Sequence, residues 1–185
     1  GRKLRIHCWR GGMRSESMAW LMQVAGFEVS TLVGGYKAFR QHVLTQLGRP
    51  FHLLVLGGKT GSGKTDMLKA LAAQGEQVID LEGLAHHKGS AFGALGQPPQ
   101  PSSELFGNRL QAALAPLDPQ RRIWVEDESH NIGRVHIPEP FWQQMKRAPV
   151  LAVEVPMAVR VERLVREYAG ADDQELAASL QRIQK

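Results

Sequence analysis

The chain has 185 residues, of which 43% are hydrophobic and 22% are charged. This composition suits one domain or two small domains with a buried core, and it excludes wholesale disorder. No apolar run approaches the roughly eighteen residues of a membrane span, and no signal-peptide core follows the charged start, so we expect a cytoplasmic protein without membrane contact. A single cysteine, Cys8, excludes an internal disulfide framework and a thiolate metal cluster.

The net charge of +5 is unevenly distributed along the chain. Residues 1–50 carry eight Lys or Arg against Glu16 and Glu28, a net charge of +6, whereas residues 51–185 carry fifteen against sixteen acidic residues, a net charge of −1. A basic segment favours a polyanionic partner such as RNA. A basic surface that is merely solvated explains the charge equally well.

The first segment, residues 1–48, alternates between strand and helix patterns. Apolar residues at helical spacing and glycine stops define these elements. They are too few to close a sheet, so we expect the N-terminal part of this domain to be absent from the chain. The Gly48-Arg49-Pro50 stop is the expected domain boundary. We predict strands at 4–7 and 27–33, and helices at 15–25 and 36–47.

The second segment, residues 51–185, opens with an apolar run bounded by glycines, which is typical of a buried parallel strand. Further strand patterns alternate with helical stretches. This alternation predicts an α/β fold with a parallel sheet and flanking helices. We predict strands at 51–56, 77–81, 123–126 and 150–155, and a helix at 64–73.

The motif Gly58-Lys59-Thr60-Gly61-Ser62-Gly63-Lys64-Thr65 satisfies G-x-x-x-x-G-K-[ST] between a predicted strand and a predicted helix. Backbone N–H groups, the helix N-terminus and the Lys64 cation suit a phosphate cradle. Thr65 is a candidate Mg²⁺ ligand, and Glu126 and Asp127 are candidates for the outer shell of the metal. The expected phosphate-binding residues are Gly58, Thr60, Gly61, Ser62, Gly63, Lys64 and Thr65.

The loop identifies phosphate but not the molecule that carries it. No base-specificity motif such as the Asn-Lys-x-Asp of GTPases is present. Either a nucleotide or a diphosphate on another organic group fits the pattern, and kinase or NTPase activity is one option.

Cys8 lies between a predicted strand and a predicted helix, in a loop whose N–H groups we expect to point inward. Nearby arginines and glycines favour a thiolate with a lowered pKa, so Cys8 is a candidate nucleophile. A lone cysteine is otherwise most often a small buried hydrophobe. Cys8 and Arg14 form C-x5-R, which both cysteine phosphatases and rhodanese-like sulfurtransferases contain. The expected anion loop is Arg10, Gly11, Gly12 and Arg14.

Three arginines recur every three residues on a predicted helix after Pro156. Arg160, Arg163 and Arg166 could meet phosphates, although a solvated face paired with acidic neighbours is the favoured interpretation. The tryptophans are expected in the core, with Trp9 as the exception because it adjoins Cys8 and could stack on a base or pack a prenyl chain.

Residues 8–15 and 26–40 resemble the C-terminal half of a rhodanese domain. Joined to a P-loop domain, the chain resembles the bacterial tRNA 2-selenouridine synthases, and segments 79–93, 124–129 and 132–134 are similar to that family too. The resemblance implies a partial rhodanese-like unit at 1–48 and a P-loop NTPase-like domain at 51–185 that is incomplete at its C-terminus.

This resemblance implies an enzyme that acts on wobble 2-thiouridine in the anticodon loop of tRNA. Geranyl diphosphate, bound by residues 58–65, would geranylate the thiouridine sulfur. Selenophosphate would then supply selenium through Cys8. Mg²⁺ is an optional ligand, and no covalently bound cofactor is expected. The oligomeric state does not follow from the resemblance. Trp9, His87 and Arg134 are candidates for substrate contact. The alternatives are a P-loop kinase or NTPase with a regulatory rhodanese remnant, and a non-catalytic tRNA-binding module.

Overall fold

A computed structural model describes residues 2–168, 170 and 173–183. The chain divides into two compact units, Gly1–Gln46 and Leu47–Lys185. This division lies just before the Gly48-Arg49-Pro50 stop. Among the helices of the described residues, none combines the length and the apolar character needed to cross a membrane.

The first unit contains a two-stranded parallel sheet. Its strands are aligned from Lys3 with Glu28 to Ile6 with Thr31. The first strand has the predicted length but begins one residue earlier, and the second is shorter than predicted. The elements are β1 (Lys3–Ile6), α1 (Met13–Val24), β2 (Glu28–Thr31) and α2 (Gly35–Leu47).

Helix α1 buries only a narrow stripe of its surface. Ser15 and Ala19, four residues apart, are its buried positions. Trp20 is 65% exposed, so the expectation that it belongs to the core is wrong. The reason is helical geometry, because a residue one position after Ala19 is turned about 100° away from it.

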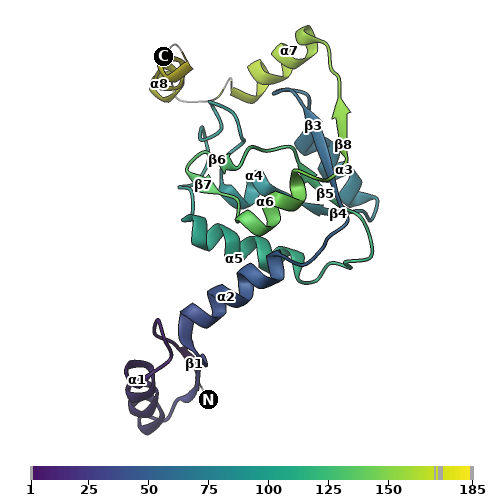
Figure 1. Ribbon diagram of the computed structural model, residues 1–185. Coiled ribbons are helices and arrows are strands. Elements are labelled where there is room, and N and C mark those ends of the chain that lie inside the picture. The colour runs from purple at the N-terminus through teal and green to yellow at the C-terminus, as the bar shows by residue number, and fades with distance from the viewer. Residues whose placement is uncertain (1, 169, 171–172, 184–185) are drawn as a thin grey trace. The chain divides into compact units, whose positions relative to one another are not determined.

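The second unit is built on a four-stranded parallel sheet (Figure 1). Along the sheet the order is β4 (Gln77–Ile79), β5 (Ile123–Glu126), β3 (Leu53–Gly58) and β8 (Val150–Val153). The predicted parallel sheet with flanking helices is therefore confirmed for this unit. Strand β3 lies between β5 and β8, so both of its edges are hydrogen-bonded.

Burial explains why these segments form inner strands. All four residues of β5 are buried, as expected for a parallel strand covered on both faces. Helix α3 (Lys64–Ala73) packs on the sheet through Leu68, which joins Leu56 and Trp124 in a core cluster. The other elements are α4 (Leu81–Ala85), α5 (Ser103–Leu114), β6 (Asn131–Ile132), β7 (Val135–His136), α6 (Glu139–Met145), α7 (Met157–Tyr168) and α8 (Asp173–Ile183).

Side-chain caps begin two of the helices. Ser102 Oγ accepts the Leu105 N–H at 3.2 Å at the start of α5. Asp80 accepts the Gly83 N–H at 2.6 Å at the start of α4. Such caps satisfy N–H groups that have no partner within the helix. The Asp80 cap fixes α4 directly after β4, at the carboxyl edge of the sheet.

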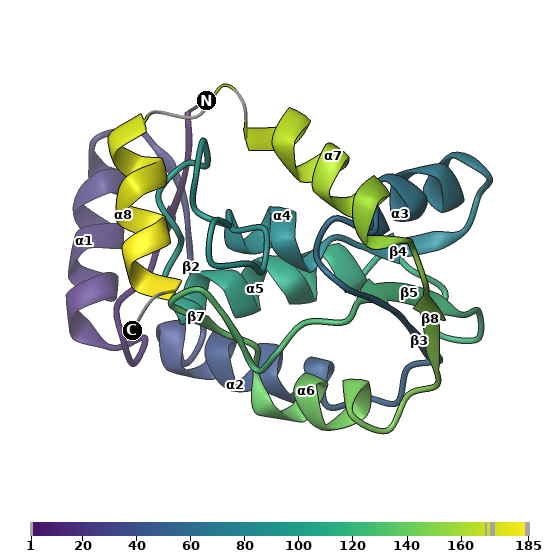
Figure 2. The ribbon, with the colours of Figure 1, turned by 90° about the horizontal axis from the view of Figure 1, so that it is seen from above.

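Helix α7 follows β8 and passes over the glycine-rich loop that follows β3. Figure 2 shows α7 beside α3, and Arg163 Nη1 of α7 lies 2.8 Å from Asp66 Oδ2 of α3. The packing is close, because a Cβ added to Gly61 would lie 2.8 Å from the Arg160 carbonyl oxygen. Because β3, β4, β5 and β8 are parallel, the four chain segments that follow them begin at one edge of the sheet. Ligands of open α/β sheets bind at this edge.

Candidate functional site

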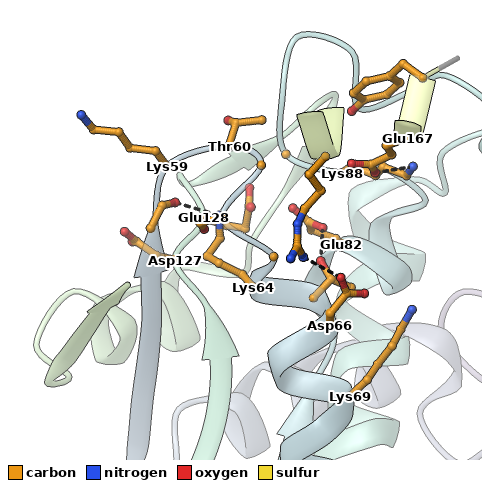
Figure 3. A pocket seen from close by; sticks show the side chains of 18 of the residues that line it. Lys59, Thr60, Lys64, Asp66, Lys69, Glu82, Lys88, Asp127, Glu128 and Glu167 are labelled. Carbon is orange, nitrogen blue, oxygen red and sulfur yellow. Dashed lines mark hydrogen bonds and ion pairs between the residues drawn. The ribbon is translucent and has the colours of Figure 1, made fainter. Parts of the chain in front are cut away.

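A cavity of about 680 Å³ opens beside the glycine-rich loop (Figure 3). It lies where β3 and β5 end, because Gly58 and Asp127 both line it. The residues predicted to bind phosphate are brought together here, since all seven line the cavity: Gly58, Thr60, Gly61, Ser62, Gly63, Lys64 and Thr65.

Two groups of the loop are suited to bind oxygen ligands. Lys64 Nζ donates a hydrogen bond to the Gly58 carbonyl oxygen at 2.9 Å, which directs the ammonium group across the loop. Ser62 is only 2% exposed, and its Oγ has no hydrogen-bond partner among the residues that the structure describes. A buried hydroxyl without a partner costs free energy, so an oxygen ligand in the loop would stabilise it.

Two carboxylates, Glu82 and Glu128, lie in the cavity close to Lys64 (Figure 3). They hydrogen-bond to each other, and Thr65 Oγ1 donates to Glu82 Oε2 at 3.2 Å. Burial, and after it the neighbouring Glu82 carboxylate, raises the pKa of Glu128 to about 8. Burial also raises the pKa of Glu82. Two adjacent carboxylates cannot both ionise cheaply, so the pair favours a bound proton or another positive partner.

The two acidic residues expected near a metal are placed differently from each other. Asp127 lines the cavity, whereas Glu126 does not. Glu126 is fully buried, and its Oε2 accepts the Leu81 N–H at 2.9 Å. Burial, and after it the charge of Asp80, raises the pKa of Glu126 to about 8. Glu126 therefore supports the backbone at the start of α4 behind the cavity.

Helix α7 contributes two cations to the cavity. Arg163 and Arg166 line it, and Arg163 Nη1 lies 2.8 Å from Asp66 Oδ2. Arg166 pairs with Glu162 on its own helix, as the favoured interpretation of a solvated face expects. That interpretation is incomplete, because α7 packs over the loop and turns Arg163 toward it.

The loop after α4 closes on the end of α7. Lys88 Nζ lies 2.6 Å from Glu167 Oε1 and 5.3 Å from the centre of the Tyr168 ring. Ser90 Oγ lies 3.3 Å from the Tyr168 hydroxyl. Lys88, Glu167 and Tyr168 all line the cavity, so this contact forms part of its wall.

His87 and Arg134, the candidates for substrate contact, are not among the residues that line this cavity. His87 Nδ1 accepts the Gly89 N–H at 3.2 Å, and burial lowers the pKa of His87. The Arg134 N–H donates to Gln100 Oε1 at 2.9 Å. Both residues help to fold the loops beside β6.

Cys8 occupies a separate loop in the first unit. Its Sγ lies 3.4 Å from Ser15 Oγ, and Ser15 Oγ donates to the Gly12 carbonyl oxygen at 2.8 Å. The Ser15 hydroxyl, followed by the backbone N–H groups of Gly12, Arg10 and Gly11, lowers the pKa of Cys8 to about 6. Hydrogen-bond donors therefore favour the thiolate: the backbone N–H groups act as the sequence suggested, the Ser15 hydroxyl adds to them, and the arginine charges are not among the causes.

The turn before α2 supports the Cys8 loop from behind. Tyr36 N–H donates to the Cys8 carbonyl oxygen at 3.0 Å, and Lys37 N–H donates to the Trp9 carbonyl oxygen at 2.9 Å. A Cβ added to Gly35 would lie 2.4 Å from the Cys8 carbonyl oxygen. The close approach of two backbones therefore holds the loop, and it requires glycine at position 35.

Trp9 remains accessible beside the thiol, with 49% of its surface exposed. Its ring centre lies 5.7 Å from that of Tyr36, whose ring also lies 6.1 Å from His7. The rings of His7 and Trp9, the two residues that flank Cys8 in the chain, thus both lie against Tyr36. Arg10 and Arg14 are exposed on the same loop and helix start, where they add positive charge.

Two residues of these sites, Ser15 and Glu82, escape sequence reasoning. Ser15 directly follows the C-x5-R motif, and that position is the signal that could have identified it. Glu128 belongs to the acidic run at the end of the predicted strand that the sequence indicated for a metal, and the structure places it in the cavity. Glu82 offers no local signal, because its place in the cavity depends on β4 lying beside β5.

Among the described residues, no group of three or more His, Cys, Asp or Glu is arranged to hold a metal ion.

Comparisons with known proteins link both parts of the chain to one family. The model of the tRNA 2-selenouridine synthase AAA domain matches residues 51–185. The chain is 43% identical over 172 residues to the tRNA 2-selenouridine synthase of Shewanella sediminis (strain HAW-EB3), which covers 88% of this chain and 44% of that protein. It is 41% identical over 172 residues to the tRNA 2-selenouridine synthase of Cupriavidus pinatubonensis, with 88% and 45% covered. The chain thus spans less than half the length of these relatives.

Proposed function

The chain belongs to the tRNA 2-selenouridine synthase family, and we propose that it forms part of an enzyme that converts wobble 2-thiouridine of tRNA to 2-selenouridine. The proposed route has two steps. Geranyl diphosphate first alkylates the thiouridine sulfur and releases diphosphate. Selenophosphate and water then replace the S-geranyl group with selenium and release geranylthiol and phosphate, so the exchange is redox-neutral.

The observation that carries this proposal is the complete glycine-rich loop opening into one cavity with Lys64 and the buried Ser62 hydroxyl. Backbone N–H groups at a helix N-terminus bind phosphate oxygens, and Lys64 adds a cation. We assign the diphosphate group of geranyl diphosphate to this cavity. In that role the loop orients the diphosphate as a leaving group and stabilises the charge that it gains when the carbon–oxygen bond breaks.

A magnesium ion fits the donor atoms of this cavity. Thr65, Glu82 and Glu128 offer a hydroxyl and carboxylate oxygens, which are the ligands that Mg²⁺ prefers together with substrate phosphates. A bound Mg²⁺ would offset the negative charge of the diphosphate. Burial and the neighbouring Glu82 carboxylate raise the pKa of Glu128, and a bound cation would relieve the repulsion between the two carboxylates.

We assign the selenium step to Cys8. A pKa of about 6 makes Cys8 mainly a thiolate at neutral pH, and the N–H groups of the loop also suit the selenophosphate anion. The exposed Trp9 ring beside it is suited to stack on the target base. Cys8 is therefore the proposed nucleophile of the selenium step. Its thiolate attacks the phosphorus of selenophosphate, the hydrogen selenide that leaves displaces geranylthiol from the base, and water then hydrolyses the cysteinyl phosphate to free thiol and phosphate.

The test uses the full-length enzyme and an anticodon stem-loop RNA with 2-thiouridine. Mass spectrometry should detect the gain of one geranyl group with geranyl diphosphate, and the exchange of sulfur for selenium after selenophosphate is added. Lys64→Ala should block the first product, and Cys8→Ala only the second. Lys146→Ala, an exposed lysine outside the cavity, serves as the control. Steady ATP hydrolysis without either RNA product would instead support a kinase or NTPase.

A further inference from the structure

Helix α7 holds a guanidinium group directly over the start of α3. A Cβ added to Gly63, the N-cap of α3, would lie 2.0 Å from Arg163 Nη1. The positive end of the α3 dipole, Lys64 and Arg163 thus converge at one place, which is unfavourable unless an anion neutralises them. From this arrangement we infer that Arg163 is a phosphate-binding residue that makes the cavity select diphosphates over monophosphates. The inference rests on the proposed diphosphate site and deepens it.

The position of Arg163 is fixed by the packing of α7. Arg160 Nη1 donates to the Thr60 carbonyl oxygen at 3.2 Å. A Cβ added to Gly61 would approach the Arg160 carbonyl oxygen to 2.8 Å and Leu164 Cγ to 3.0 Å. Helix α7 therefore touches the loop through backbone as well as side chains, and Arg163 lies one turn further along the same face.

The present partner of Arg163 is one that a phosphate can replace. Asp66 Oδ2 lies 2.8 Å away, but the Asp66 side chain is 72% exposed and that of Arg163 is 42% exposed. Ion pairs this exposed are weak, whereas a guanidinium binds two phosphate oxygens at once through a planar fork. An incoming diphosphate should therefore take Arg163 from Asp66.

The Ser62 hydroxyl in the same cavity is independent evidence for a bound ligand. Ser62 Oγ is buried and lacks a hydrogen-bond partner within the described part of the chain, and Ser62 lines the cavity with Arg163. The loop amides, Ser62 and Lys64 provide donors for one phosphoryl group. Arg163 comes from α7 and not from the loop, and it adds a guanidinium to these donors, so it would serve the second phosphoryl group.

The inference is tested by calorimetric titration with inorganic pyrophosphate and inorganic phosphate. Arg163→Gln should weaken pyrophosphate binding by at least about tenfold, the loss expected for a charged hydrogen bond, and should change phosphate binding by less than about twofold. Arg163→Lys should give an intermediate loss. Arg147→Gln removes the same charge beside the beginning of β3, at the opposite edge of the sheet, and should change neither affinity.

Substitution of Asp66 provides a second, independent test of the inference. Asp66→Asn should strengthen pyrophosphate binding about threefold or more by releasing Arg163, and this gain should vanish in the Arg163→Gln background. Unchanged pyrophosphate affinity in Arg163→Gln, an equal loss of both anions, or a gain from Asp66→Asn that survives without Arg163 would each overturn the inference.

The same titrations separate this inference from the proposed function. Geranyl diphosphate should bind the wild-type protein more tightly than pyrophosphate. If the pyrophosphate results follow the expected pattern and geranyl diphosphate binds no better, the prenyl assignment fails and the role of Arg163 stands.

Discussion

Cys8 Sγ and Ser15 Oγ lie 3.4 Å apart, although the first follows β1 and the second lies in the first turn of α1. Ser15 is buried, and its hydroxyl also bonds to the Gly12 carbonyl oxygen at 2.8 Å. When the thiol loses its proton, rotation of this hydroxyl lets it donate to sulfur instead. The loop thereby stabilises the thiolate through the Ser15 hydroxyl and backbone N–H groups.

Removal of the Ser15 hydroxyl should make the thiol less acidic. We expect Ser15→Ala to move the midpoint of Cys8 alkylation by iodoacetamide upward from about pH 6 by roughly one pH unit, because the largest cause of the lowered pKa is lost. The thiolate form prevails above the pKa, so the loss of rate should be greatest near pH 6 to 7 and small above pH 9. Ser17→Ala, on an exposed part of α1, is the control. An unchanged midpoint would falsify the role of Ser15.

The backbone contact between the two loops of the first unit leads to a second prediction. Gly35→Ala should destabilise this unit by about 3 kcal/mol or prevent its folding, because the new Cβ would meet the Cys8 carbonyl oxygen at 2.4 Å. Gly26→Ala has a similarly positive φ but open space around its Cβ, so it should cost only about 1 kcal/mol. Thermal unfolding followed by calorimetry measures both variants. Equal losses for the two would show that the contact does not matter.

The buried carboxyl group of Glu126 should make the second unit less stable in alkaline solution. Its folded-state pKa of about 8 exceeds the ordinary value of 4.5, so the unfolded chain releases this proton first as the pH rises. Below about pH 4.5 the Glu126 carboxyl group is protonated in both the folded and the unfolded chain, so it does not oppose folding. The free energy of unfolding then falls as the pH rises from about 4.5 to about 8.

Glu126→Gln keeps the shape without the ionisation. It should therefore match the wild type near pH 5 and exceed its free energy of unfolding by roughly 3 kcal/mol at pH 9. Urea unfolding followed by circular dichroism provides the measurement, with the exposed Glu154→Gln as control. A wild-type advantage at pH 9 would contradict this account.

The fit of magnesium to the cavity gives a fourth prediction. Mg²⁺ should strengthen pyrophosphate binding by about tenfold in the wild type, and Thr65→Val should lose most of this gain because its side chain offers no oxygen. Thr65→Ser restores the hydroxyl and should restore the gain. Titrations with and without EDTA make the comparison, and a Thr65→Val protein that still responds fully to Mg²⁺ would remove Thr65 from the site.

The glycine-rich loop and the helix after it could be located from the sequence because both depend on local chemistry. Residues 58–65 match a spacing that backbone N–H groups impose, and α3 begins and ends at the residues predicted for it. The apolar run before the loop likewise predicts a buried strand, and the structure places β3 inside the sheet. The boundaries of all five predicted strands other than β5 differ from the structure, namely those of β1, β2, β3, β4 and β8, because hydrogen bonding to a neighbouring strand decides where a strand begins and ends.

The surroundings of the loop and of Cys8 depended on tertiary structure. Glu82 joins Thr65 only because β4 lies beside β5, and Arg163 reaches the loop only because α7 follows β8. Whether an arginine or a carboxylate is solvated depends on what packs against it, and no spacing in the chain encodes that. By itself the sequence determined that a phosphate-binding motif and a lone thiol were present. Only folding decided which charges face them, because electrostatic interactions act through space and not along the chain.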